Sequence, residues 1–76
     1  SSAYVLPEEA IVRFGNKQCI FIAINNLQYE MKEVTTGDAE NGLIAITDAN
    51  GVDLKNATIV TQNAYTLLMI LKNKAE

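Results

Sequence analysis

The densest run of apolar side chains in the chain covers residues 18–24, where six of seven residues are apolar. A strand with one face in water alternates apolar and polar residues. This segment does not alternate, so both of its faces are expected to be buried. It is too short for a typical helix, and turn-forming residues flank it at 15–17 and 25–26. We therefore predict that it is the central strand of a small antiparallel sheet.

The chain before this strand is expected to contribute an extended lead-in, one helical turn and a short strand. Residues 4–6 can lie along a sheet or cross onto it. Pro7 followed by Glu8 and Glu9 is typical of a first helical turn, because proline fits the first position and the helix dipole favours acids there. The two glutamates could form an acid/base pair, but adjacent residues point in different directions on a helical turn, so we interpret them as solvated. Residues 11–14 then form a strand.

The chain after the central strand predicts two more strands. Residues 27–31 alternate, with the apolar side chains on one face. The next apolar residue is Val34, so the alternation slips at 32–33, and a β-bulge there is the simplest explanation. Residues 37–42 are predicted to be a polar connection. Residues 43–47 are predicted to be a further strand, too apolar to be an exposed edge.

The loop over residues 48–53 holds three oxygen-bearing side chains and so resembles a calcium-binding loop. It lacks the distal glutamate and the 12-residue frame of such a loop, so we interpret Asp and Asn beside Gly as turn formers. Leu54 is predicted to anchor the loop on the core. Residues 58–61 are predicted to be a short fifth strand.

A helix is predicted from Ala64 to about Lys74, with Asn63 as its N-cap. Its main apolar face is formed by residues at helical spacing, namely Ala64, Leu67, Leu68 and Leu71. Three further apolar residues, Tyr65, Met69 and Ile70, lie off that face. A partner-binding or membrane-surface helix would also have such a surface, but the basic polar face of a membrane-surface helix is missing. We expect the helix to pack on the core with one additional neighbour.

Length and pattern together predict one domain over residues 1–76, mainly β with one C-terminal helix, in the α+β class. The expected architecture is a small antiparallel β-barrel or roll of about five to six strands. A chain of this size buries only about 60–65% of the surface that its unfolded form exposes, so modest stability is expected.

Charge and composition exclude several partners. The net charge is −3 and the six basic residues are scattered, which argues against nucleic-acid binding. No apolar run approaches the ~18 residues of a membrane span. The single cysteine, Cys19, lies inside the apolar strand, where a thiol usually acts as a small hydrophobic side chain.

The residues that usually carry chemistry are sparse. The chain has no histidine, which removes the commonest general base and metal ligand. Its sulfur atoms, in Cys19, Met31 and Met69, belong to different predicted elements, so a copper(I) site is not expected. We find no nucleophile elbow, phosphate loop or dinucleotide fingerprint. The sequence therefore predicts a protein that is not an enzyme and has no cofactor or metal site.

Four segments, in their order and spacing, resemble the C-terminal part of periplasmic adaptor subunits of tripartite RND efflux pumps, the membrane fusion proteins of the hemolysin D type. Residues 6–12, then Gly15, then 19–23 are similar to the family's "v-P-x-x-A-v" segment, turn and "v-F-v" strand. The downstream matches are residues 29–37 with "f-x-x-r-x-V-x-x-G", 41–46 with a "v-e-I" strand, and 54–60 with "L-k-x-G-d-x-V-V". Asn56 and Ala57 depart from the usual Gly-Asp, and the helical tail is more apolar than the common family ending.

The resemblance implies a membrane-proximal domain with a mechanical function. Such a domain docks on the periplasmic part of an inner-membrane RND transporter, and the whole adaptor couples that transporter to an outer-membrane channel. The implied location is the periplasm, with attachment to the inner membrane and further adaptor domains supplied by parts outside this sequence. The residues of these motifs are most similar to those of adaptors from the heavy-metal or cation efflux branch. A chain that begins with Ser1 and no methionine is expected to be a piece of a longer protein.

A different class of function, a free-standing small β-rich module that binds a ligand or a protein, stays open as the alternative. Such a small-molecule module should have a concave pocket with convergent polar groups, whereas a docking module should have a flat or ridged patch. Because loops on a rigid sheet commonly carry recognition, we predict that the transporter is contacted by residues at two turns, namely Arg13, Phe14, Asn16, Lys17, Asn25 and Asn26.

The resemblance also implies an incomplete surface. In the adaptors, a strand from near the N-terminus joins this domain, and that strand is missing here. We therefore expect an exposed apolar patch or an unpaired strand edge, either of which favours self-association.

Overall fold

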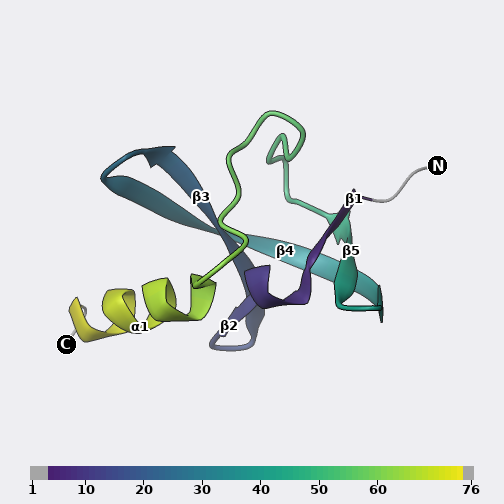
Figure 1. The fold of residues 1–76 in the computed structure, drawn as a ribbon, viewed down its shortest axis with the longest axis horizontal. Helices are drawn as coiled ribbons and strands as arrows, with labels where there is room; N and C mark the ends of the chain where they lie inside the picture. The colour runs from purple at the N-terminus through teal and green to yellow at the C-terminus, as the bar shows by residue number, and fades with distance from the viewer. Residues whose placement is uncertain (1–3, 75–76) are drawn as a thin grey trace.

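A computed structural model describes residues 4–74 of the chain, and these residues form one antiparallel sheet and a C-terminal helix (Figure 1). The elements, in chain order, are β1 (Tyr4–Pro7), the 3-10 turn η1 (Glu8–Ala10), β2 (Val12–Phe14), β3 (Lys17–Asn25), β4 (Gln28–Glu40), β5 (Leu43–Asp48) and α1 (Ala64–Lys74). The strand order is β1-β5-β4-β3-β2. The predicted mainly β, α+β class with one C-terminal helix is confirmed for the described residues.

Of the two predicted architectures, a barrel or a roll, the closed barrel is wrong, because β1 and β2 are the two edges of an open sheet. The chain between these edges forms η1, whose backbone bonds locally through Ile11 N–H donating to the Glu8 carbonyl at 3.1 Å. A helical turn cannot continue a strand ladder. The helical turn predicted at Pro7 therefore forms, and it separates the two edges that a barrel would have joined.

β3 is buried on both faces, as its unbroken apolar run predicted. Successive residues of a strand point to opposite faces, and here each face of β3 belongs to a different cluster. The first cluster comprises Leu6, Ala10, Ile20, Ile22, Val34, Ile46 and Leu54. The second lies against α1 and comprises Val12, Cys19, Phe21, Ala64 and Leu68. The core is thus divided into two layers with β3 between them.

β4 is one continuous strand, which corrects two predictions. No bulge occurs at Lys32 and Glu33, because the pairing with β3 stays regular from Gln18↔Val34 to Ala23↔Tyr29. Met31 packs against the cluster beside α1 and Val34 belongs to the other cluster, so the slip in the apolar pattern reflects a change of buried face. The register shifts lie instead beside Thr36, where β4 pairs with β5, and between Ala23 and Asn25, near the hairpin tip.

The predicted polar connection over residues 37–42 is also wrong for most of its length. β4 runs on to Glu40, and only Asn41 and Gly42 form the turn, with φ values of 56° and 80°. These left-handed conformations suit an Asn-Gly hairpin turn. The end of β4 is polar because it is exposed, so its composition is similar to that of a loop.

Gly37 lies where β4 and β5 approach closely. A Cβ atom at this position would lie 2.9 Å from Thr47 Cγ2. Thr47 is held in place because its hydroxyl donates to the Thr35 carbonyl at 3.2 Å. Moving the Thr47 side chain away would break that hydrogen bond.

We expect Gly37→Ala to lower the free energy of unfolding by about 1–2 kcal/mol, as overpacked substitutions commonly do. Thr47→Ser removes the clashing methyl group and keeps the hydroxyl. Adding Gly37→Ala to Thr47→Ser should therefore lower the free energy of unfolding much less than adding Gly37→Ala to the wild type. Urea unfolding of the four proteins measures this. Equal losses from Gly37→Ala in the wild type and in Thr47→Ser would show that the Thr47 methyl group is not the clashing neighbour.

The segment between β5 and α1 crosses back over β3. Leu54 is buried in the first cluster and anchors this loop, as predicted. The fifth strand predicted at residues 58–61 is reduced to one bridge between Ile59 and Ile22, flanked by hydrogen bonds from Ala23 N–H to the Thr58 carbonyl and from Val60 N–H to the Phe21 carbonyl. A short segment therefore covers the edge of β3 beyond the end of β2.

α1 spans the predicted residues but buries a narrower face than its sequence suggests. Ala64 and Leu68 are buried, whereas Leu71 is 40% exposed. Asn63 precedes the helix in a left-handed conformation with φ of 64°, and its carbonyl accepts the first helical hydrogen bond from Leu67 N–H. Within residues 4–74, no helix has both the length and the apolar character needed to cross a membrane.

Candidate functional site

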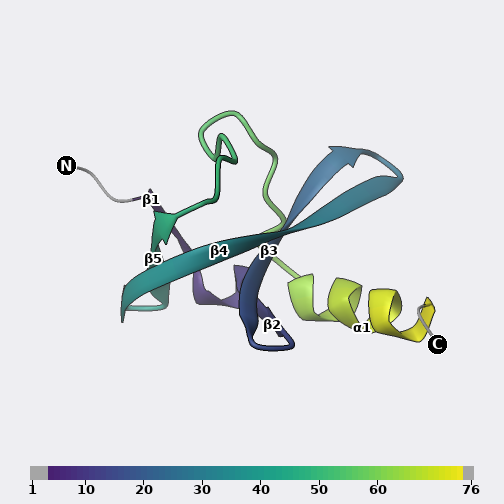
Figure 2. The ribbon, with the colours of Figure 1, turned by 180° about the vertical axis from the view of Figure 1, so that it is seen from behind.

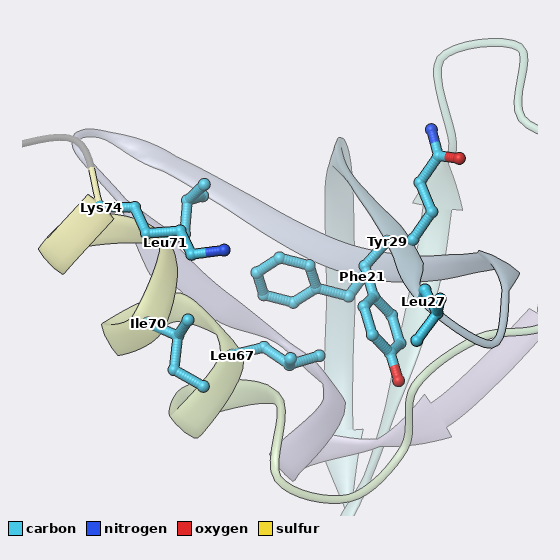
Figure 3. A pocket seen from close by; sticks show the side chains of 8 residues that line it. Phe21, Leu27, Tyr29, Leu67, Ile70, Leu71 and Lys74 are labelled. Atoms are coloured by element: carbon cyan, nitrogen blue, oxygen red, sulfur yellow. The ribbon is translucent and has the colours of Figure 1, made fainter.

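An apolar groove of about 270 Å³ lies between α1 and the hairpin formed by β3 and β4 (Figure 3). The hairpin and the helix project at the same end of the molecule, as the two opposite views show (Figures 1 and 2). The groove is lined by Phe21, Leu27, Gln28, Tyr29, Leu67, Ile70, Leu71 and Lys74. Six of these eight residues are apolar or aromatic.

The groove exists because α1 and the hairpin are buried only where they meet in the second cluster. The second cluster occupies the start of α1, through Ala64 and Leu68. The apolar residues nearer the end of the helix and on the hairpin stay in water, with Leu27 94%, Ile70 48% and Tyr29 46% exposed. Large apolar surfaces gathered in one place on a small protein usually mark an interaction site. This groove confirms the expectation of an exposed apolar patch.

The charge at the groove comes from one lining residue, Lys74. It lies in the last turn of α1, together with Lys72, where cations complement the helix dipole. Figure 3 shows its side chain running along the helix side of the groove, with the amine directed toward Phe21. An otherwise acidic chain therefore places a positive charge beside its most exposed apolar surface.

Chemistry-bearing side chains do not gather in the described part of the chain. Residues 4–74 contain no group of three or more His, Cys, Asp or Glu side chains that could hold a metal ion. Cys19 is buried in the second cluster. Burial raises the pKa of its thiol, the Glu33 carboxylate raises it further, and Lys17 opposes this rise. A thiol of this kind is a poor nucleophile.

We expect the chain to bind zinc, copper(I) and silver(I) weakly, because it lacks histidine and because Cys19 is buried. Titration calorimetry of each ion with the purified chain measures this. One-to-one binding tighter than about micromolar, roughly −8 kcal/mol, would contradict the prediction.

The six predicted partner contacts fall into two separate groups. Arg13, Phe14, Asn16 and Lys17 surround the turn between β2 and β3, whereas Asn25 and Asn26 form the tip of the hairpin between β3 and β4. These turns lie at opposite ends of β3, roughly 26 Å apart for a strand of this length. The structure therefore does not bring the six residues together, and only Asn25 and Asn26 adjoin the groove, next to Leu27.

Sequence analysis did not select the groove residues themselves, although two signals pointed to them. Tyr65, Met69 and Ile70 gave α1 more apolar surface than its main face required, and Ile70 does line the groove. Leu27 directly follows the turn residues Asn25 and Asn26, an unusual place for a large apolar side chain. Neither signal shows that the two surfaces lie opposite each other, because that depends on how α1 packs.

We compared the chain with protein-family models, curated proteins and solved structures, and none of them matches it.

Proposed function

We propose that this chain is a non-catalytic docking domain, the membrane-proximal domain of a periplasmic adaptor in a tripartite RND efflux pump. In this role it binds the periplasmic part of the inner-membrane transporter, and the rest of the adaptor links the transporter to the outer-membrane channel. The residues of its motifs resemble those of adaptors from the cation efflux branch. The exposed apolar groove carries the docking part of this proposal, and the four motif segments support the family.

The character of the groove favours a protein partner over a small molecule. Small-molecule pockets typically enclose about 300–1,000 Å³ and place a few polar groups around the ligand. This groove is slightly smaller, and both of its polar lining residues, Gln28 and Lys74, are exposed. The described residues bury no polar or charged side chain that could orient a ligand. These observations count against the alternative of a free-standing module that binds a small ligand.

The turn between β2 and β3 provides a test of the proposed role. Arg13 and Lys17 are exposed there, and Lys17 makes a surface ion pair with Glu33 at 3.7 Å. Exposed ion pairs contribute only about 0–1 kcal/mol, so charge reversal should leave the fold intact. We expect Arg13→Glu/Lys17→Glu in the whole adaptor to weaken efflux in cells, because it reverses the charge of a predicted transporter contact.

Efflux is measured as the resistance of the host cells, compared with a strain that lacks the adaptor. Lys55→Glu, on an exposed loop away from both turns, is the control for the single reversal Lys17→Glu. Thermal unfolding of the isolated chain shows that each variant folds. Wild-type resistance in the double variant would rule out this turn as a transporter contact.

A further inference from the structure

The chain contains two Asn-Gly pairs, and both adopt the same kind of turn. Asn41 and Gly42 join β4 to β5 with φ values of 56° and 80°, and Asn50 and Gly51 lie in the loop after β5 with φ values of 52° and 85°. Positive φ at both central residues is the property of a type I′ turn. The two pairs therefore share residue types and backbone conformation, and a difference in their reactivity has to come from their surroundings.

Asparagine followed by glycine undergoes a reaction that needs no enzyme. The backbone nitrogen of the glycine attacks Cγ of the asparagine, and glycine has no side chain to obstruct this approach. The new N–C bond closes a five-membered succinimide ring, and the side-chain nitrogen leaves as ammonia with the proton of the glycine amide. Water then opens the ring at either carbonyl. The net reaction consumes one water, releases ammonium and leaves a carboxylate, as aspartate or as isoaspartate with the main chain running through Cγ.

Asn50 is held by two hydrogen bonds beyond those of its turn. Its side-chain amide donates to the Glu33 carbonyl at 3.0 Å, and its backbone N–H donates to the Asp48 carboxylate at 2.8 Å. The succinimide ring does not fit a left-handed turn, so the turn has to open locally before reaction. Reaction at Asn50 also breaks the bond to Glu33, because the nitrogen that makes this bond is the leaving group.

Asn41 is held only by the backbone of its hairpin. Its side chain is exposed, and its amide forms no hydrogen bond within the described residues 4–74. The carbonyl of Gly42 accepts from Glu8 N–H at 2.9 Å, which ties the hairpin to the start of η1. This bond does not restrain the Asn41 side chain, so the amide is free to rotate toward the attacking nitrogen.

We propose that Asn41 is a site of spontaneous modification to aspartate and isoaspartate, with water as the co-reactant, and that its hydrogen bonds protect Asn50 from the same reaction. The two additional bonds at Asn50 correspond to a roughly tenfold lower population of the open turn. The inference concerns the chemistry of the chain itself and does not depend on the docking function.

Modification at Asn41 should loosen the contact between the hairpin and the start of the chain. Isoaspartate adds a backbone atom to a two-residue turn, which moves the Gly42 carbonyl. The new carboxylate also lies next to Glu40, on a chain whose net charge is already −3. The hydrogen bond from Glu8 N–H to the Gly42 carbonyl is therefore expected to be lost in the modified chain.

Warm storage of the purified chain at pH 8, followed by peptide mass spectrometry, measures the reaction at each asparagine. Fragmentation assigns the change from amide to acid, and chromatography separates aspartate from isoaspartate. In the folded chain we expect Asn41 to react about tenfold faster than Asn50. In urea, where both turns are lost, the two rates should be equal. A folded rate at Asn50 equal to or above that at Asn41, or the same ratio in urea, would overturn the inference.

Hydrogen exchange of two backbone amides tests the structural consequence. Glu8 N–H should exchange at least tenfold faster in the stored chain than in the fresh chain. Val60 N–H, which donates to the Phe21 carbonyl at 2.9 Å, should keep its protection. Asn41→Gly is the matched control, because glycine adopts the left-handed conformation and has no amide to lose. Storage should leave Glu8 exchange unchanged in this variant, and equal acceleration in both proteins, or none in the wild type, would overturn the inference.

Discussion

Ile20→Ala is expected to remove a large share of the free energy of unfolding of this domain. Ile20 is fully buried, at 0% exposure, and is the largest side chain buried to that degree. Truncation of a buried isoleucine to alanine costs about 2–5 kcal/mol, because it removes apolar contacts and leaves a cavity. A domain of this length is expected to have roughly 4–11 kcal/mol in total. We predict a loss of about 3–4 kcal/mol and a midpoint of thermal unfolding lower by roughly 12–30 °C.

Ile24→Ala is the matched control, because Ile24 lies in the same strand four residues further on and is 48% exposed. Its truncation should cost less than about 1 kcal/mol, as is usual for exposed positions. Urea unfolding of both variants gives the two free energies. Similar losses in the two variants would contradict the burial of Ile20 in the first cluster.

Cys19 is expected to react with thiol reagents at least about a thousandfold more slowly than the same cysteine in an unfolded peptide. The side chain is 4% exposed and belongs to the second cluster, so reaction requires opening of the domain. An opening free energy of about 4 kcal/mol corresponds to roughly a thousandfold protection. Labelling of the native chain at pH 8, followed by mass spectrometry, measures the rate.

A variant with the cysteine moved to an exposed place, Cys19→Ala/Ile24→Cys, should label at nearly the rate of the peptide. A native labelling rate within tenfold of the peptide rate would contradict burial of Cys19.

The raised pKa of the Cys19 thiol also makes the stability of the chain depend on pH. The folded chain holds this proton more tightly than the unfolded chain, so the contribution to stability is complete below the ordinary thiol pKa of 9.0 and falls as pH rises above it. Cys19→Ala should lose this part of the decline.

The elements with an unambiguous pattern were predictable. The unbroken apolar run of β3 identified a strand buried on both faces, and the helical spacing around Ala64 and Leu68 identified α1 within its observed bounds. Both patterns follow from burial within a single element. The predicted transporter contacts at the two turns remain predictions.

The features that depend on how elements meet were not predictable. The bulge predicted beside Val34 failed because period-two patterns assume one buried face, whereas β4 buries one face at Met31 and the other at Val34. Closure of the sheet depends on whether its edge strands β1 and β2 pair with each other, and the apolar pattern within a single strand does not show which strands pair. The groove depends on the packing angle of α1 against the hairpin, and only its excess of apolar residues could be recognised in the sequence.

Photo-cross-linking from the hairpin tip in living cells tests the docking function most directly. A photoreactive amino acid replaces Leu27 in the whole adaptor, since this side chain is 94% exposed and makes little contribution to the fold. We predict a light-dependent adduct that mass spectrometry identifies as an inner-membrane RND transporter, with little adduct from the same substitution at Leu43, on β5. Absence of a transporter adduct at Leu27, or equal adducts at both positions, would contradict the account.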